Sequence, residues 1–254
     1  MVGVGAGLAR AGFIPFVHSF SVFLSRRSFD QIAMQIAYPK TNVKLVGFMP
    51  GIDSLLGVSH QAIDDIALMR ALPNMTILEP AGPADYEDAV AAALANAGPV
   101  YLRLYRATAP ATPLDGVSPL QTGRIRCLHH GNDAAIFATG LMVEQALLAA
   151  KDLKSQSINA SVIDCASIKP LDVESILEVI SQSKIIVTAE NHTVIGGLGS
   201  AIAEIIAGNN IARPFFRIGV QDCFAEGGSR SFLFRKYGLS ARDIAAAVKQ
   251  GLTS

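Results

Sequence analysis

The sequence predicts an α/β protein with two domains, each a mostly parallel sheet covered by helices. Short apolar runs alternate with segments whose apolar residues recur every three or four positions, as strand–helix–strand units require. A Pro-rich stretch at 107–122 interrupts this alternation once, and the alternation resumes after it. We therefore expect one domain at 1–106, a linker at 107–122 and a second domain at 123–254.

The first domain begins with Gly and Ala at close spacing, which suits a helix packed tightly against its neighbours. A helical pattern covers 22–37, and another helix is expected to be capped by Ser59 and ended by Pro73. The remaining predicted elements are strands at 13–20, 42–48, 75–78 and 100–105 and a helix at 83–96.

The second domain repeats this order. The predicted strands are 134–138, 160–164, 184–189 and 214–218, and the predicted helices are 143–153, 173–181, 200–207 and 241–251. Glycines at 196, 197 and 199 follow a strand and open a helix. They fit an anion site at a helix N-terminus, and they fit close packing of a helix on a sheet equally well.

Composition excludes several classes of protein. Lys plus Arg equals Asp plus Glu, at 21 each, so the chain lacks the basic excess of a nucleic-acid binder. No apolar run reaches the roughly 18–20 residues of a membrane span, and we expect a cytoplasmic protein. The three cysteines lie far apart without a C-x-x-C motif. They indicate buried thiols rather than a zinc site or a disulfide framework, and no metal site is expected.

Chemistry-bearing side chains follow the predicted strands of the first domain. Phe20 and Phe23, His60, Glu79 and Arg106 all lie at or after carboxyl ends of strands, where ligands of parallel sheets bind. Aromatic rings can stack on a flat heterocycle, and a guanidinium suits a phosphate. Each also has a structural alternative: core packing for the two rings, capping for His60 and a surface ion pair for Arg106.

Six blocks, in this order, resemble the pyrimidine-binding and C-terminal segments of transketolases. The blocks are 16–32 ending in Asp-Gln-Ile, 57–61 containing Ser-His-Gln, 67–76, 190–200 opening with Glu-Asn-His, 217–222 and 236–239. The resemblance covers essentially the whole chain. It implies the pyrimidine-binding domain of that family, followed by its C-terminal domain.

Transketolases use thiamine diphosphate, and their third domain binds the diphosphate and Mg²⁺. That domain has no counterpart here, so the resemblance implies the C-terminal subunit of a split transketolase. An N-terminal subunit would bind the diphosphate and Mg²⁺, in a homodimer or heterotetramer. The implied activity is transfer of a two-carbon ketol unit from a ketose to an aldose through nucleophilic catalysis by the cofactor.

The family's catalytic glutamate falls just upstream of Met1. We therefore expect a pyrimidine-binding domain that is incomplete at its N-terminus and a chain that is inactive alone. About 55–60 further residues and the partner would restore activity. Apolar surface near 2–8 is expected to be exposed, so that the chain self-associates.

The resemblance also assigns roles to residues. Phe20 and Phe23 would line the aminopyrimidine, His60 would contact substrate hydroxyls and share in proton transfer, and Arg106 would bind the phosphate end of the sugar. Two positions depart from the family: Met49 replaces a phosphate-binding histidine, and Leu56 replaces an acid that binds a sugar hydroxyl. These departures predict a substrate other than the common pentose phosphates, such as a branched, deoxy or sulfonated sugar.

Two alternative functions remain open from the sequence. The β subunit of a 2-oxo-acid dehydrogenase E1 has the same pair of domains and the same cofactor. A truncated chain without catalytic function is the second alternative.

Overall fold

We analysed a computed structural model, which describes residues 1–106 and 116–253. In the first half it contains α1 (Val2–Arg10), β1 (Phe16–Phe20), α2 (Ser21–Ser25), α3 (Phe29–Ile32), the π-helix η1 (Ala33–Ala37), β2 (Lys44–Phe48), the 3₁₀ turn η2 (Val58–His60), α4 (Asp65–Ala71), β3 (Thr76–Leu78), the 3₁₀ turn η3 (Pro83–Asp85), α5 (Tyr86–Ala95) and β4 (Val100–Leu104).

The second half contains β5 (Arg126–His129), β6 (Ala134–Ala138), α6 (Met142–Lys154), β7 (Ala160–Asp164), β8 (Ser167–Lys169), α7 (Val173–Ser181), β9 (Ile185–Thr193), α8 (Leu198–Gly208), β10 (Phe215–Val220), α9 (Arg230–Lys236) and α10 (Ala241–Thr253).

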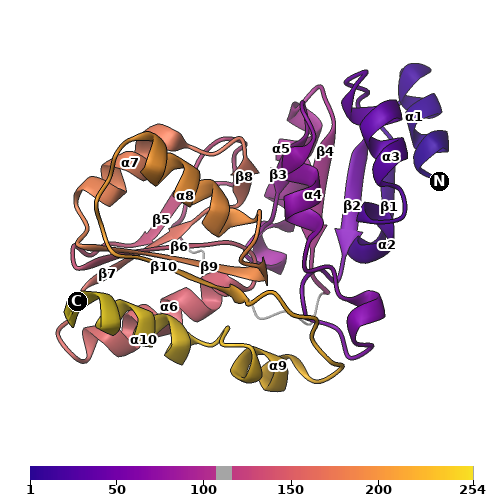
Figure 1. The fold of residues 1–254 in the computed structure, drawn as a ribbon. Coiled ribbons are helices and arrows are strands. Elements are labelled where there is room, and N and C mark those ends of the chain that lie inside the picture. The colour runs from indigo at the N-terminus through magenta and orange to yellow at the C-terminus, as the bar shows by residue number, and fades with distance from the viewer. Residues whose placement is uncertain (107–115, 254) are drawn as a thin grey trace.

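Within the described residues these strands form two five-stranded sheets, ordered β1-β2-β4-β3-β8 and β10-β9-β6-β7-β5 (Figure 1). The pairs β3–β8 and β5–β7 are antiparallel, and the other pairs are parallel. The predicted architecture of two mostly parallel sheets covered by helices is confirmed. The expected domain boundaries stay a prediction, because residues 107–115 of the linker lie outside the described residues.

Successive residues of each strand serve opposite faces of its sheet, as the period of two requires. In β2, Leu45 packs in the core beneath α1, α3 and α4, while Val46 packs in the core beneath α5. In β6, Ile136 faces α6 and α10, while Phe137 faces α7 and α8 (Figure 1). Both faces of each sheet are covered, which explains why the strands read as continuous apolar runs.

The two halves are joined by more than the linker. Strand β8 follows β7 of the second sheet but pairs with β3 of the first. One hydrophobic core also contains residues from both halves: Ile52, Ile63 and Tyr105 are buried together with Leu233 and Phe234 of α9. The relative placement of the sheets is therefore fixed by shared packing.

Three local predictions are wrong. The helix expected over 22–37 is broken after Ser25, whose hydroxyl donates to the carbonyl oxygen of Ser21 at 2.7 Å, a contact that bends helices. Ser59 does not cap a helix, since α4 begins at Asp65 and the Ser59 hydroxyl instead contacts His60. Of the three thiols, only Cys165 is buried.

The start of the chain forms helix α1, as predicted. A methyl group on Gly5 would lie 2.5 Å from Val17 Cγ2, so the glycine allows the helix to approach β1 closely. Val2 and Ala6 are buried, whereas Val4 and Leu8 are exposed.

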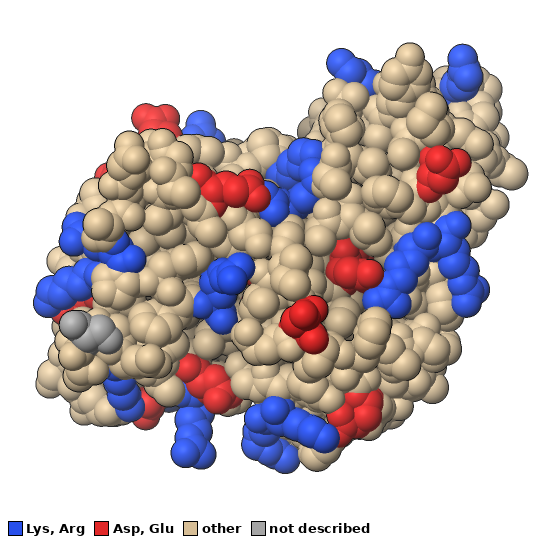
Figure 2. Space-filling view, in the orientation of Figure 1, with Lys and Arg blue, Asp and Glu red and all other residues tan. Residues whose placement is uncertain are grey.

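The described surface carries both signs of charge. On the face shown in Figure 2, Lys and Arg side chains are interspersed with Asp and Glu, and other residues cover most of the area. Among the described residues, no helix combines the length and the apolar character that crossing a membrane requires.

Candidate functional site

Three aromatic rings meet at the carboxyl end of β1. Phe20 ends that strand, Phe23 lies one turn into α2, and His60 lies on η2. The Phe20 and Phe23 centroids are 5.7 Å apart, and the His60 ring lies 5.5 Å from Phe20 and 5.0 Å from Phe23. All three contacts are edge-to-face, the geometry that ring quadrupoles favour. The rings are half-buried, so this chain leaves part of each ring uncovered.

The His60 imidazole is held at one nitrogen. Its Nδ1 lies 2.9 Å from the hydroxyl of Ser59. Among the described residues, Nε2 of His60 has no hydrogen-bond partner. The arrangement orients the ring against both phenylalanines and leaves one nitrogen available to a ligand. The Arg27 guanidinium lies over the Phe23 ring, 4.2 Å from its centroid.

A pocket of about 610 Å³ opens beside Phe20. Met49 and Arg106, which follow β2 and β4, lie in its wall, and Nε of Arg106 is 3.1 Å from Met49 Sδ. The other lining residues are His18, Ser19, Phe48, Tyr86, Leu104 and Tyr105. The pocket thus combines a largely apolar wall with one exposed guanidinium, a group suited to an anion.

Leu56 lies apart from this pocket. It is 58% exposed, near the tip of a loop that runs from Gly51 to Ala62, and it is not among the residues described as lining the pocket. The structure therefore brings Phe20, Phe23 and His60 together, and Phe20, Met49 and Arg106 together. Leu56 shares only the loop with His60.

Beneath the pocket lies a buried ion cluster. Arg103 of β4 donates from Nε to Asp65 at 2.9 Å and from Nη1 to Glu79, and Nη2 reaches the Asn191 carbonyl at 2.9 Å. Tyr101 and Tyr105 donate their hydroxyls to Asp65 and Glu79 respectively. Burial alone would raise the pKa of Asp65, but the Arg103 charge and the hydrogen bonds from Arg103 and Tyr101 act together against it, and the pKa is lowered.

A second ion cluster joins the halves. Arg126 of β5 donates to Asp85 of η3 and to Asp164 of β7. Although Asp164 accepts bonds from Arg126, burial raises its pKa to about 6. Desolvation therefore outweighs the guanidinium at this carboxylate.

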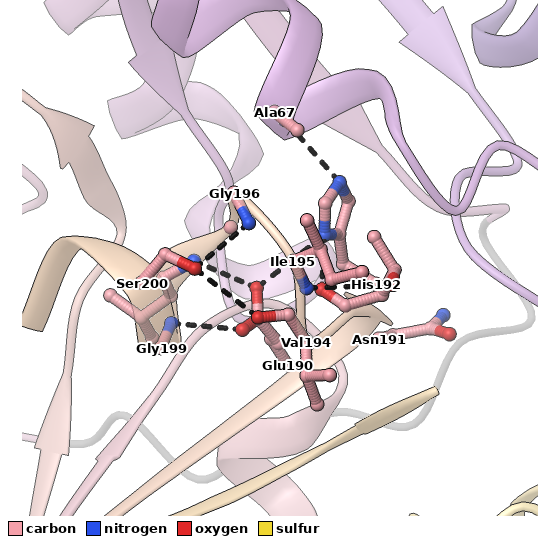
Figure 3. Close-up of polar contacts among 12 residues, drawn as sticks. Ala67, Glu190, Asn191, His192, Val194, Ile195, Gly196, Gly199 and Ser200 are labelled. Atoms are coloured by element: carbon pink, nitrogen blue, oxygen red, sulfur yellow. Dashed lines mark hydrogen bonds and ion pairs between the residues drawn. The ribbon is translucent and has the colours of Figure 1, made fainter. Parts of the chain in front are cut away.

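The Glu-Asn-His block at 190–192 fixes the two halves to each other (Figure 3). Glu190 accepts the backbone N–H groups of Leu198 at 2.7 Å and Gly199 at 2.8 Å. Asn191 Oδ1 accepts from Ile52 N at 3.0 Å, and His192 Nε2 accepts from Ala67 N at 3.3 Å. The first side chain thus binds within the second half, and the next two bind the first half.

Glu190 also decides between the two interpretations of the glycines that follow it. Its carboxylate occupies the N-terminus of α8, and a methyl group on Gly197 would lie 1.9 Å from Glu190 Oε2. The glycines therefore allow an internal carboxylate to take the anion position. Burial raises the pKa of Glu190 to about 7, and burial lowers the pKa of His192 to about 4.

The chain matches two family models. These are the transketolase pyrimidine binding domain, over residues 1–111, and the transketolase C-terminal domain, over residues 123–244. It is 45% identical over 252 residues to a 6-deoxy-6-sulfo-D-fructose transketolase subunit of Clostridium sp. (strain MSTE9), covering 98% of this chain and 77% of that protein.

The chain belongs to the transketolase family. A second relative is a putative transketolase C-terminal section of Methanocaldococcus jannaschii, 39% identical over 253 residues and covering 98% of this chain and 79% of that one. A solved structure described as a split gene transketolase, inactive beta4 tetramer, is 44% identical with a TM-score of 0.89, covering 99% of this chain and 80% of that chain. The protein is thus a C-terminal, transketolase-like subunit of the split type.

Sequence reasoning missed several residues around the candidate site of this transketolase subunit. Phe48 and Tyr86 line the pocket, and Arg103 organises the cluster below it. Phe48 could have been predicted as a lining residue, because it ends a predicted strand and ligands bind at the carboxyl ends of parallel strands. Arg103 gave none, because it lies within an apolar run. Among the described residues, no group of three or more His, Cys, Asp or Glu side chains is placed to hold a metal ion.

Proposed function

We propose that this subunit completes an enzyme that transfers a two-carbon ketol unit from a ketose to an aldose. The observation that carries the proposal is the adjacency of the Phe20–Phe23–His60 ring cluster to a pocket with one guanidinium, Arg106. A site for a flat heterocycle next to a site for an anion is what a cofactor-dependent sugar-phosphate or sugar-sulfonate reaction needs.

The ring cluster fits the pyrimidine end of thiamine diphosphate. Its rings are half-buried and edge-to-face, so each keeps uncovered surface against which a flat ring packs. Phe20 and Phe23 would hold that ring. When bound, the cofactor supplies the carbon nucleophile of the C–C transfer. An N-terminal subunit would hold the diphosphate and Mg²⁺.

The side chains of this chain would bind and orient the sugar. His60, fixed by Ser59, offers Nε2 to a substrate hydroxyl and holds or gives up a proton there. Arg106 binds the anionic end of the substrate. Arg106 contacts the Met49 thioether in place of the imidazole that the resemblance places there. This contact supports a substrate outside the common pentose phosphates, as does the 45% identity to a subunit named for a sulfonated sugar. Leu56 offers no carboxylate to a hydroxyl, but it lies apart from the pocket, so its role in substrate choice stays a prediction.

Assembly is part of the proposal. A similar split-gene chain forms a tetramer that is described as inactive, which supports the prediction that this chain alone has no activity. We propose a homodimer or heterotetramer completed by the N-terminal subunit. The similarity to transketolase subunits favours a transketolase over a 2-oxo-acid dehydrogenase subunit. A cytoplasmic location and the absence of catalytic function in a truncated chain stay predictions.

The role of His60 provides the test. In the assembled enzyme, His60→Gln should lower kcat/KM by about 100-fold or more, since it removes the proton-transfer group. His130→Gln changes an exposed histidine of the second half and serves as the matched control. An unchanged kcat/KM in His60→Gln would contradict the assignment.

A further inference from the structure

The loop from Gly51 to Ala62 is closed at its base. Gly51 and Ala62 form an antiparallel bridge, with Gly51 N donating to Ala62 O at 2.7 Å. Ile52 and Ile63, at the two ends, are buried in the core that contains α9. The base of the loop is therefore fixed by packing and by the Asn191 amide described above.

The tip of the same loop has little packing of its own. Leu55 is 73% exposed and Val58 is 45% exposed. A loop with few buried apolar contacts opens locally at low free energy unless other interactions hold it. His60 lies where this exposed tip returns to the base, so its position depends on what holds the tip.

Three contacts reach the loop from the segment 226–230, which we call the brace. Arg230 forms a two-pronged ion pair with Asp53, from Nε at 2.9 Å and from Nη2 at 2.6 Å. Gln61 Nε2 donates to the Glu226 carbonyl at 3.0 Å. The backbone of Gly227 lies against the loop, since a methyl group there would be 2.4 Å from the Leu55 carbonyl oxygen.

The brace is itself firmly attached. The Glu226 carboxylate accepts from Lys236 and from the Tyr237 hydroxyl, at the far end of α9. Leu233 and Phe234 of α9 are buried in the shared core. Arg230 therefore links the loop to α9, a helix of the second half that is fixed in place by its buried side chains.

We propose that Arg230 is a positioning residue that, through Asp53, holds the loop in the conformation that places His60 against both Phe20 and Phe23. A guanidinium that binds a carboxylate with two parallel bonds fixes both distance and orientation. The pair is three-quarters or more buried on each side, so solvent screens it only in part. The second half of the chain thereby shapes a site that lies in the first half. The catalytic consequence rests on the proposed function; the structural one does not.

Amide hydrogen exchange of the isolated chain tests the structural claim. Arg230→Gln and Asp53→Asn should each accelerate exchange at 54–60 by about tenfold or more, with α8 and β9 unchanged. Arg230→Lys keeps the positive charge but cannot form two parallel bonds to Asp53. Its exchange rate at 54–60 should therefore lie between those of wild type and Arg230→Gln. Glu204→Gln is the matched control, because it breaks another ion pair between the two halves, with Arg70, that does not touch the loop. Unchanged exchange at 54–60 in Arg230→Gln would overturn the proposal.

A glycine variant tests the same contact without removing a charge. Gly227→Ala should also accelerate exchange at 54–60, because its methyl group meets the Leu55 backbone. Gly208→Ala is the control, since a methyl group there meets nothing within 4 Å. Protection at 54–60 equal to wild type in Gly227→Ala would count against the brace.

Kinetics of the assembled enzyme test whether Arg230 acts through His60. Arg230→Gln should lower kcat/KM on the order of 10- to 100-fold, as a small misplacement of a catalytic group does. Combined with His60→Gln, it should add no further loss. Additive losses would show that Arg230 acts elsewhere and would overturn the proposal. If His60→Gln alone leaves kcat/KM unchanged, the proposed function is contradicted. The exchange measurement at 54–60 still tests whether Arg230 holds the loop.

Discussion

Arg103 in β4 donates a 2.9 Å hydrogen bond to the carbonyl oxygen of Asn191 in β9. The same guanidinium pairs with Asp65 and Glu79, so the buried ion cluster of the first sheet is bonded directly to a strand of the second. Asn191 Oδ1 also accepts a hydrogen bond from the Ile52 N–H at the base of the loop. The Arg103–Asn191 bond therefore links the two sheets at the edge of the candidate site.

Arg103→Met should destabilise the chain strongly. The substitution leaves Asp65 and Glu79 fully buried without a counter-charge, and loss of one partner from such a cluster costs about 3–5 kcal/mol. Urea denaturation measures the free energy of unfolding. Lys184→Met, which removes an exposed ion pair with Asp133, should cost less than about 1 kcal/mol. Equal losses in the two variants would contradict the cluster's role.

His192 should make stability depend on pH. Burial lowers the pKa of this residue from 6.5 to about 4, so between these values the unfolded chain binds a proton that the folded chain does not. The His192 contribution to stability therefore rises as pH rises from about 4 to 6.5, by about 3 kcal/mol in total. Glu190, with its pKa raised from 4.5 to about 7, acts in the opposite direction between those values.

A difference measurement separates the two residues. The free energy of unfolding of wild type minus that of His192→Gln should increase from pH 4 to 6.5 and then stay constant. Glutamine can still accept from Ala67 N and donate to Thr193 O, as His192 does. Gly208→Ala, which changes no titratable group, should give a difference independent of pH. A pH-independent difference for His192→Gln would refute the linkage.

Local pattern predicted the regular elements of the fold and missed the pairing between halves. Strand β6, at 134–138, and helix α7, at 173–181, lie where predicted, because each forms a periodic apolar pattern. Strand β8 was missed because it has three residues and precedes Pro170. Its partner β3 lies some 90 residues away in the sequence and leaves no local signal.

Some contacts of the candidate site were also predictable from the sequence, and others were not. Phe20, Met49 and Arg106 share a pocket because the ends of adjacent parallel strands meet, which topology makes predictable. The Asp53–Arg230 pair joins residues 177 positions apart. Such a contact depends on how the halves pack, so single-sequence reasoning offered no basis for it. The assigned roles of the six candidate residues stay predictions.

Substrate choice should depend on Met49. Met49→His places an imidazole beside Arg106 and should raise kcat/KM for phosphorylated sugars relative to sulfonated ones by about tenfold, the value of one charge-assisted hydrogen bond. A panel containing xylulose 5-phosphate, ribose 5-phosphate and branched, deoxy and sulfonated sugars measures the ranking. Met34→His, at an exposed methionine of η1, is the control. Highest efficiency of wild type on xylulose 5-phosphate with ribose 5-phosphate would contradict the proposed substrate class.

The isolated chain should self-associate. Val4 on α1 and Phe13 after it are 67% and 63% exposed, and apolar surface of this kind favours association. Light scattering should give a mass well above 26.8 kDa, and Val4→Glu with Phe13→Glu should lower it. Leu148→Glu, at an exposed leucine of α6, should not. A monomer at high concentration would contradict this expectation.

Reconstitution tests the central claim most directly. Two-carbon transfer from a ketose to an aldose is measured with thiamine diphosphate and Mg²⁺, using the subunit as its gene encodes it, an N-terminal subunit, or both. We expect turnover only with both chains present, and loss of that turnover without the cofactor. Turnover by this subunit alone, or none with both chains and the full substrate panel, would contradict the proposed function.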